Sequence, residues 1–496
     1  MFIPMTIYRN YINGNWQESA SAKTAPNLNP ANTEDILGQV RLSTREEARA
    51  AVDAAQAAFP QWRATPAPVR GKILARWARL LEEHKEELAG ILTREEGKTL
   101  GESRGELQRS INVAEFCAGE TRRLNGETIQ SELPSNFAYT MKQPHGVVAC
   151  VTPWNFPVAI PVWKIAPALA AGNAVVFKPA TNTPASAVRI VELLAEAGLP
   201  PGVLSLILGS GSLVGDEITN HKAVRAISFT GSNEVGIRLY EQASRRGAKV
   251  QCEMGGKNPV VILADADLDL AVECTVQGAF GSTGQRCTAT SRAVVIEEIA
   301  DEFVRRVVEK AERLRLGDGA DADTDVGPCV DEGQMNTVLR YLAVGRNEGA
   351  EIKCGGRRAD GGVLANGYFV APTVFDYVTP DMRLAREEIF GPVLAVQRVK
   401  DFDEAMRVAN ASEYGLSSAI FTNDATKIFR FVDEIETGMT HVNSPTTGGE
   451  AHIPFGGSKA TGIGDREQGS TALDFYTELK VVYVDYTGRK REGNLY

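Results

Sequence analysis

Apolar runs of six to eight residues recur between residues 146 and 256 and are separated by longer amphipathic stretches. The runs cover residues 146–153, 174–179, 204–209, 226–231 and 249–256. One stretch between them opens at Thr183-Pro184, continues to Glu196 and stops at Gly198, which is the order of proline and glycine that a helix favours. Strands that alternate with helices predict a parallel sheet with helices on both faces.

Residue 259 begins a second series of the same kind, which we interpret as a second α/β domain. Its apolar runs lie at 259–267, 291–298, 367–375 and 393–399, and a helix is predicted over 301–314. Because both series alternate strands with helices, an α/β fold with two separate sheets is expected.

The chain before residue 100 shows other patterns. Asn13-Gly14 between Tyr11-Ile12 and Asn15-Trp16 predicts a hairpin, because both turn residues tolerate a positive φ. Ser43-Thr44-Arg45-Glu46 predicts a capping box at the start of an alanine-rich helix, and amphipathic helical spacing continues over 68–97.

Composition and charge narrow the class of protein. The 496 residues suggest roughly three domains at a typical size of about 150 residues, and a hydrophobic share of 43% excludes wholesale disorder. A net charge of −10 without a basic cluster argues against nucleic-acid binding. No apolar run reaches the ~18 residues of a membrane span, and the start lacks the basic-then-apolar order of a signal peptide.

Cysteine and histidine spacing indicates neither disulfides nor a metal. Seven cysteines are scattered along the chain, none in C-x-x-C, and five histidines form no H-x-x-x-H or Cys/His cluster. An odd number of cysteines without such spacing argues against a disulfide framework and a structural zinc site. We therefore expect a cytoplasmic protein without a metal, whose cysteines are mostly small core residues.

Two glycine-containing turns are candidates for binding a phosphate. Gly209, Gly211 and Gly215 follow one apolar run, but a plain loop is the simpler explanation of a lone glycine cluster. Residues 229–236 end a strand, turn at Gly231 and enter a helix, whose free N–H groups and dipole attract an anion. By itself the second turn fits a phosphate site or a loop equally well.

Three polar residues could carry catalysis, although each has a simpler structural explanation. Cys287 lies among small residues after Arg286, which would favour a thiolate, but a buried loop cysteine is the simpler interpretation. Glu253 ends an apolar strand before two glycines, and it could be a general base of raised pKa or half of a salt bridge. Asn155 could donate to an oxyanion or merely form a turn.

Taken together, the motifs resemble the aldehyde dehydrogenase superfamily. The matching segments run in order along nearly the whole chain: NGNW at 13–16, PWNFP at 153–157, FKPA at 177–180, FTGS at 229–232, EMGGKNP at 253–259, GQRC at 284–287, EEIFGP at 387–392, PFGG at 454–457 and YTELK at 476–480. Chance agreement of so many short motifs in one order is negligible.

The resemblance implies roles for five catalytic residues. Cys287 would attack an aldehyde to give a thiohemiacetal, whose oxyanion Asn155 and the Cys287 N–H would hold. After hydride transfer, Glu253 would activate water to hydrolyse the thioester to a free acid, and relatives that hand the acyl group to coenzyme A typically lack this Glu. Lys164 and Glu478 match positions thought to support a proton path from Glu253.

The resemblance also implies an NAD(P) site. The residues at matching positions are Trp154, Lys178, Gly231, Ser232, Glu388 and Phe390. Lys178 would contact the adenosine ribose or its phosphate, Glu388 would bind the nicotinamide ribose, and Phe390 would lie beside the ring. Thr181 stands where strictly NAD-using relatives often carry Glu, so nothing there repels a 2′-phosphate. We therefore predict that NADP is used at least as well as NAD.

For the substrate, residues 444–488 most resemble bacterial 2,5-dioxopentanoate (α-ketoglutarate semialdehyde) dehydrogenases. Arg109 is the candidate anchor for the substrate carboxylate, and an exposed helical arginine is the alternative. Phe156, Trp163 and Phe455 would form apolar walls or else be plain core aromatics. A succinate-semialdehyde or broad aliphatic aldehyde dehydrogenase is the second possibility. A non-catalytic ligand-binding relative is a remote third, because Cys287 and its two partners are all present.

The fold that the resemblance implies has two parallel-sheet α/β domains and a small β oligomerisation flap. Residues 1–123 and 145–254 would form the NAD(P)-binding domain and residues 255–453 the catalytic domain. Residues 124–144 and 454–496 would form the flap and the C-terminal segment. In the flap, 136–144 and 480–488 would pair, and their exposed edges predict a homodimer or a homotetramer.

Overall fold

The apolar runs between residues 147 and 253 form the centre of an eight-stranded sheet in the computed structural model, which describes residues 5–490. The strand order is β22-β12-β11-β8-β9-β10-β2-β3, and the five strands from β12 to β10 are parallel. The strands are β2 Asn10–Ile12, β3 Asn15–Gln17, β8 Val147–Val151, β9 Ala174–Lys178, β10 Leu204–Leu206, β11 Val224–Thr230, β12 Lys249–Glu253 and β22 Gly462–Ile463. Antiparallel pairs close both edges.

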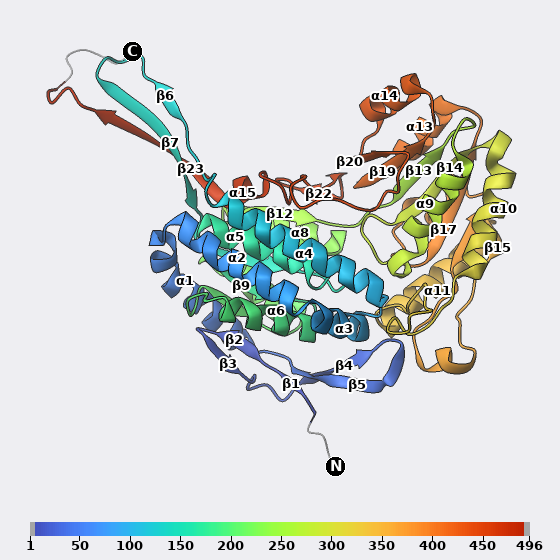
Figure 1. Cartoon of the computed structure of the whole chain (residues 1–496), viewed down its shortest axis with the longest axis horizontal. Coiled ribbons are helices and arrows are strands. Elements are labelled where there is room, and N and C mark those ends of the chain that lie inside the picture. Colours follow the sequence, from blue (N-terminus) through green and yellow to red (C-terminus); the bar gives the residue numbers. More distant parts are fainter. Residues whose placement is uncertain (1–4, 491–496) are drawn as a thin grey trace.

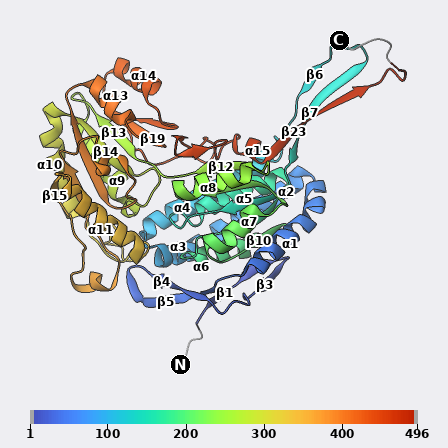
Figure 2. The same cartoon turned by 180° about the vertical axis from the view of Figure 1, so that it is seen from behind.

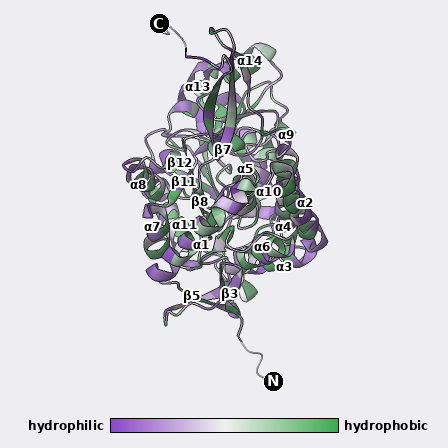
Figure 3. Ribbon diagram, turned by 90° about the vertical axis from the view of Figure 1, so that its left-hand side faces the viewer, coloured by the Kyte–Doolittle hydropathy of each residue, from purple (hydrophilic) through white to green (hydrophobic). Residues whose placement is uncertain are grey.

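Helices cover both faces of this sheet, as the alternation predicted (Figures 1 and 2). They are α1 Arg45–Ala64, α2 Ala67–Glu83, α3 Lys85–Glu96, α4 Leu100–Glu120, α5 Ala159–Ala171, α6 Pro184–Glu196, α7 Asp216–Asn220 and α8 Asn233–Ser244. Val148 and Cys150 of β8 belong to one buried core, whereas Val147 and Ala149 belong to the core on the other face. Figure 3 shows hydrophilic and hydrophobic residues on the same helices, which is the amphipathic pattern that such packing requires.

The predicted hairpin is confirmed, and the predicted capping box lies one residue further along. Tyr11 pairs with Trp16 across a turn in which Asn13 has a φ of 50° and the following glycine one of 80°. At the start of α1 the box joins Thr44 to Glu47, rather than Ser43 to Glu46. The Ser43 hydroxyl instead accepts a hydrogen bond from Asn10.

The second series of apolar runs forms a seven-stranded sheet of order β15-β16-β17-β14-β13-β19-β20. Its strands are β13 Asn258–Ile262, β14 Thr290–Ile296, β15 Glu351–Cys354, β16 Thr373–Asp376, β17 Val393–Val399, β19 Ser417–Phe421 and β20 Met439–Val442. Its main helices are α9 Leu268–Phe280, α10 Glu297–Arg313, α11 Glu332–Asn347, α13 Phe402–Asn410 and α14 Ala425–Glu434. Of the predicted run 367–375 only the end is a strand, because Pro372 has no N–H for the ladder.

A three-stranded arm projects from the body (Figure 1). It consists of β6 Thr128–Gln130, β7 Asn136–Pro144 and β23 Thr477–Asp485, in the order β23-β7-β6. The pairing of β7 with β23 confirms the two predicted flap strands. Leu479 and Tyr483 on β23 are 61% and 71% exposed, so the arm presents apolar side chains to its surroundings.

Two small sheets complete the fold. One joins β1 Ile7–Tyr8, β4 Thr24–Asn29 and β5 Asn32–Arg41, and the other joins β18 Tyr414–Gly415 and β21 Ser458–Lys459. The remaining short helices are α12 Arg383–Arg386 and α15 Ala472–Phe475. Between residues 5 and 490 no helix combines the length and the apolar character needed to cross a membrane.

The topology brings several of the motifs to one edge of the first sheet. Parallel strands β8, β9, β11 and β12 end at Val151, Lys178, Thr230 and Glu253. After the second sheet the chain returns, and Gly462 on β22 pairs with Glu253. Ligands bind at the carboxyl ends of parallel strands in folds of this type, so this edge is where a site is expected.

Candidate functional site

Cys287 follows a short left-handed turn at the end of α9. Ser282 and Thr283 have φ angles of 48° and 59°, which residues other than glycine rarely adopt, and Gly284 follows at 66°. A Cβ on Gly284 would lie 2.2 Å from a carbonyl oxygen, so no side chain fits there. Glu102 on α4 holds the turn by accepting the Ser282 N–H at 2.6 Å. The position of the cysteine is therefore fixed by backbone geometry and by a second element.

Two cavities meet at Cys287, one of about 240 Å³ and one of about 220 Å³. The residues on the first, here called the substrate cavity, include Arg109, Phe156, Trp163 and Phe455. Those on the second, here called the cofactor cavity, include Trp154, Asn155, Gly231, Ser232, Glu388 and Phe390. Cys287 lines both, so its thiol can meet one reactant on each side.

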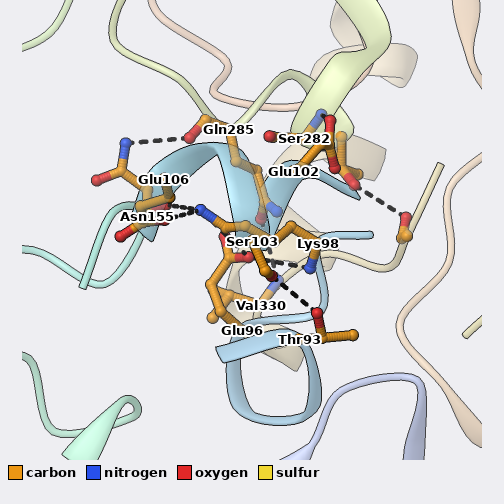
Figure 4. Close-up of polar contacts among 12 residues, drawn as sticks. Thr93, Glu96, Lys98, Glu102, Ser103, Glu106, Asn155, Ser282, Gln285 and Val330 are labelled. Atoms are coloured by element: carbon orange, nitrogen blue, oxygen red, sulfur yellow. Dashed lines mark hydrogen bonds and ion pairs between the residues drawn. The ribbon is translucent and has the colours of Figure 1, made fainter. Parts of the chain in front are cut away.

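Asn155 reaches the cysteine loop from the turn between β8 and α5. Its side-chain Nδ2 donates to the backbone carbonyl oxygen of Gln285 at 3.0 Å. Its backbone carbonyl accepts a hydrogen bond from Lys98 Nζ at 2.7 Å (Figure 4). A side-chain amide has two N–H donors, so one is left for another acceptor. Asn155 and Cys287 both line the cofactor cavity, and the oxyanion role of Asn155 stays a prediction.

Glu253 carries a buried carboxylate close to a second acid that sequence analysis did not identify. Its Oε2 accepts the N–H of Gly457 at 3.2 Å. Burial, and then the charge of Glu467, raise the pKa of Glu253 well above its ordinary value, while the charge of Lys164 opposes the shift. A carboxylate with a raised pKa can take up and release a proton nearer neutral pH, as a general base must.

The structure contradicts the predicted grouping of Lys164 with Glu478. Lys164 on α5 forms a buried ion pair with Glu467 instead, and Glu467 Oε2 has no hydrogen-bond partner among residues 5–490. Glu478 lies exposed on β23, opposite Gln143 of the arm, because the chain has already left the body by that residue. The signal that could have found Glu467 is Lys164 itself, since a lysine in an apolar helix needs a buried acid.

The environment of Cys287 favours the thiol over the thiolate. Burial, and then the charge of Glu253, raise the pKa of Cys287 to about 12, and the charge of Arg109 acts in the opposite direction. The expectation that Arg286 favours a thiolate is not met. Its guanidinium pairs with Glu102 at 3.0 Å and so stabilises the turn rather than the sulfur.

The cofactor cavity has features that fit a dinucleotide. Ser232 is the N-cap of α8 and makes no side-chain cap, so the first N–H groups of that helix are available to a phosphate. The half-buried Glu388 accepts the N–H of Gly256 at 2.9 Å, and removal of its carboxyl from water raises its pKa to about 7. The rings of Trp154 and Phe390 meet edge to face at 5.4 Å. An anion site, a carboxylate for ribose hydroxyls and an aromatic wall are thus present together.

Lys178 and Thr181 lie at the end of β9, outside the lining of both cavities. Lys178 Nζ donates to the carbonyl of Pro179 at 2.6 Å, and burial lowers the pKa of Lys178 to about 8. Thr181 Oγ1 donates to the carbonyl of Gly209 at 3.1 Å. Their contacts with the adenosine half of a cofactor stay predictions.

Arg109 is half-buried in the substrate cavity, which disfavours the alternative of an exposed helical arginine. Its guanidinium donates to the Gly449 carbonyl at 2.7 Å and to Gln468 Oε1 at 2.9 Å, and it lies 5.4 Å from the ring centre of Trp163. That ring in turn is 5.5 Å from Phe455. The salt bridges of the described residues include no carboxylate for Arg109, so its charge has no counter-charge there.

Comparison with known proteins agrees with this geometry. The profile of the Aldehyde dehydrogenase family matches residues 16–482. An alpha-ketoglutarate semialdehyde dehydrogenase of Haloferax volcanii is 47% identical, over 96% of this chain and 99% of the relative. An alpha-ketoglutaric semialdehyde dehydrogenase of Bacillus subtilis is 44% identical over 96% and 98%. The crystal structure of betaine aldehyde dehydrogenase from Staphylococcus aureus with NAD⁺ superimposes with a TM-score of 0.95, at 38% identity over 97% of this chain and 95% of that one.

The raised pKa of Cys287 predicts how its alkylation depends on pH. Because only the thiolate reacts, the rate with iodoacetamide should rise about tenfold per pH unit from pH 7 to pH 9, without a plateau. Arg109→Met should slow the reaction, since it removes the charge that lowers the pKa. Arg104→Met, on the exposed side of the same helix, is the control. Peptide mass spectrometry would follow Cys287, and a plateau below pH 8 would contradict the predicted pKa.

Proposed function

Because the chain belongs to the aldehyde dehydrogenase family, we propose that it oxidises 2,5-dioxopentanoate to 2-oxoglutarate with NADP or NAD. Family membership makes the chain an oxidoreductase that uses a nicotinamide cofactor. The observation that carries the proposed reaction is the position of Cys287 between the substrate cavity and the cofactor cavity. The named activity of the two semialdehyde dehydrogenase relatives supports the choice of substrate.

In the proposed first step the sulfur of Cys287 bonds to the aldehyde carbon. The carbonyl oxygen becomes an oxyanion, which the free N–H of the Asn155 amide and the backbone N–H of Cys287 stabilise. Losing one donor of this kind typically raises a barrier by about 3–4 kcal/mol. Burial raises the pKa of Cys287, so its proton must leave as the S–C bond forms, and the Glu253 carboxylate, whose charge acts on this thiol, can accept it.

The second half of the reaction releases the acid. The bound nicotinamide supplies an acceptor for the hydride that leaves the aldehyde carbon, and a thioester on Cys287 results. Glu253 then takes a proton from water, the water oxygen bonds to the acyl carbon, and the thioester C–S bond breaks. Glu467, which pairs with Lys164, acts electrostatically on Glu253. Its carboxylate can therefore accept the proton that Glu253 must release.

The charge of Arg109 supports an aldehyde with an anionic end. A half-buried guanidinium without a counter-charge is unfavourable in the free enzyme, and a substrate carboxylate would supply that charge. The aromatic residues Phe156, Trp163 and Phe455 would enclose the carbon chain between the two ends. A cavity of about 240 Å³ is smaller than the roughly 300–1,000 Å³ of sites for drug-sized ligands, which favours a short substrate.

The arm supports a homo-oligomer, either a dimer or a tetramer. Exposed apolar residues on an edge strand are a liability in a monomer, and pairing with a second copy removes it. The exposed apolar side chains of the arm are Ile129, Phe137, Met141, Leu479, Val481, Tyr483 and Val484. We propose the cytoplasm as the location, because all seven cysteines are free.

The substrate proposal predicts a tenfold or greater lead in kcat/KM for 2,5-dioxopentanoate over succinate semialdehyde and propanal. That ratio corresponds to about 1.4 kcal/mol of transition-state preference. Arg109→Met should lower kcat/KM for 2,5-dioxopentanoate by roughly tenfold to a hundredfold and should affect propanal less. Initial rates of NAD(P)H formation measure both. Equal kcat/KM values with all three aldehydes would contradict the choice of 2,5-dioxopentanoate as substrate. They would still be consistent with aldehyde oxidation.

The role of Glu253 predicts a separation of the two half-reactions. Glu253→Ala should still form one NAD(P)H per active site in a rapid burst, because hydride transfer precedes hydrolysis. Steady-state turnover should fall by roughly a hundredfold or more. Glu478→Ala, on the exposed arm, is the matched control and should turn over normally in stopped-flow measurements. A Glu253→Ala enzyme with an unchanged steady-state rate would exclude Glu253 as the base.

The absence of an acid at Thr181 predicts that Thr181→Glu selects against NADP. A carboxylate there would repel the 2′-phosphate and raise the KM for NADP by roughly tenfold, while the KM for NAD would change little. Thr181→Gln is the control, because a glutamine side chain has the size of glutamate without its charge. If both variants change the two cofactors alike, Thr181 does not face the adenosine ribose.

A further inference from the structure

A buried charged pair lies behind the Asn155 turn and has no part in the reaction as described. Lys98 stands in the short link between α3 and α4, and Glu106 follows it on α4 (Figure 4). Their side chains are 1% and 0% exposed, and the two charged groups meet at 2.6 Å. Removing two charges from water costs several kcal/mol per ion and is seldom recovered as stability. The pair therefore calls for an explanation other than stability.

Lys98 contacts both the predicted oxyanion donor and a wall of the substrate cavity. Its Nζ donates to the carbonyl oxygen of Asn155 at 2.7 Å. The same ammonium lies 4.1 Å from the ring centre of Phe156, within the range of a cation–π contact. One cation thus fixes the backbone at Asn155 and the ring that follows it.

Glu106 holds the other end of the same turn. Its Oε2 accepts a hydrogen bond from Lys98 Nζ. Its Oε1 accepts hydrogen bonds from the N–H groups of Val158 and Ala159 at 2.8 Å and 3.0 Å. These are the residues at which α5 begins. The turn that carries Asn155 is therefore held through its carbonyl on one side and through two N–H groups on the other.

The side chain of Asn155 has a third restraint, its hydrogen bond to the Gln285 carbonyl on the cysteine loop. Gln285 is itself fixed, since its Oε1 accepts the N–H of Val330 at 3.0 Å. The second N–H of the Asn155 amide remains available for a substrate oxygen, and its position depends on the turn as well as on this hydrogen bond. Movement of about 1 Å in a catalytic group can cost a hundredfold in rate, so what holds the turn bears on the rate.

We propose that Lys98, fixed by Glu106, is a positioning residue that holds the Asn155 turn and thereby sets the oxyanion donor against Cys287. The proposal rests on the oxyanion role given to Asn155 under the proposed function. It goes beyond that role, because the contacts of Lys98 and Glu106 are with the Asn155 turn, although Glu106 also lines the substrate cavity. The proposed effect of Lys98 on kcat runs through the Asn155 turn, and this dependence can be measured.

The test is a double-mutant cycle with Lys98→Met, Asn155→Ala and the double variant, using purified full-length enzyme, 2,5-dioxopentanoate or propanal, and NADP. Lys98→Met should lower kcat by roughly tenfold to a hundredfold, less than the 10²–10³-fold loss of a donor, and should leave the KM for NADP unchanged. In the Asn155→Ala background the same substitution should lower kcat by less than about threefold, because a donor that is absent cannot be misplaced.

Arg398→Met is the matched control. Arg398 pairs with the buried Asp376 at 2.8 Å, and neither residue lines the substrate or cofactor cavity. Its loss should lower the unfolding temperature without lowering kcat, whereas a purely structural role for Lys98 would make the two variants alike. Equal losses of kcat in Lys98→Met and Arg398→Met would overturn the proposal.

The remaining outcomes separate this proposal from the one it rests on. If Asn155→Ala loses rate and the fold-losses of the two variants multiply, Lys98 does not act through Asn155 and only the present proposal falls. If Asn155→Ala keeps its kcat, the oxyanion role falls and the positioning role falls with it. Should Lys98→Met fail to fold by circular dichroism, Glu106→Gln replaces it in the cycle with the same expected dependence, because it removes the carboxylate that fixes Lys98.

Discussion

The left-handed turn at residues 282–284 is the constraint on which the rest of the site depends. It directs the chain out of α9 so that Cys287 lies where two cavities meet. Two non-glycine residues held at positive φ cost free energy, of order 1–3 kcal/mol each, and persist only where their surroundings hold them. Here α4 does so through Glu102, and the same helix carries Arg109 and Glu106. One helix, α4, therefore contacts the turn before Cys287, carries the candidate substrate anchor Arg109 and holds the turn of Asn155, the proposed oxyanion donor.

Burial of charge is the second theme of the site. The pKa values of Glu253, Cys287 and Glu388 are all raised, and burial is the first cause in each case. Lys164 opposes the shift of Glu253, Arg109 that of Cys287 and Lys257 that of Glu388, and these cations come from separate segments of the chain. Burial of this kind shifts the balance of all three groups toward their neutral forms.

Local patterns predicted the elements well and the motif residues in part. Strand–helix alternation gave both sheets, and the arm strands paired as expected, because these features depend on period and register alone. The prediction that groups Glu478 with Lys164 was wrong, because a short motif does not reveal that β23 has left the body. Glu467 lies beside Lys164 only because the chain returns to the first sheet at β22. Lys98 and Glu106 gave no signal, since the backbone groups that they hold, at Asn155 and Val158, are distant in sequence. The domain boundaries stay predictions.

The path of the chain through the two sheets bears on its synthesis. Residues 258–442 build the second sheet between β12 and β22, although β22 completes the edge of the first sheet next to β12. During translation, strand β12 with Glu253 at its end must wait as an open edge until β22 leaves the ribosome. Unpaired edges of this kind invite contact with other chains. The long interval before closure makes the nascent chain, rather than the finished enzyme, the form most exposed to aggregation and most in need of chaperones.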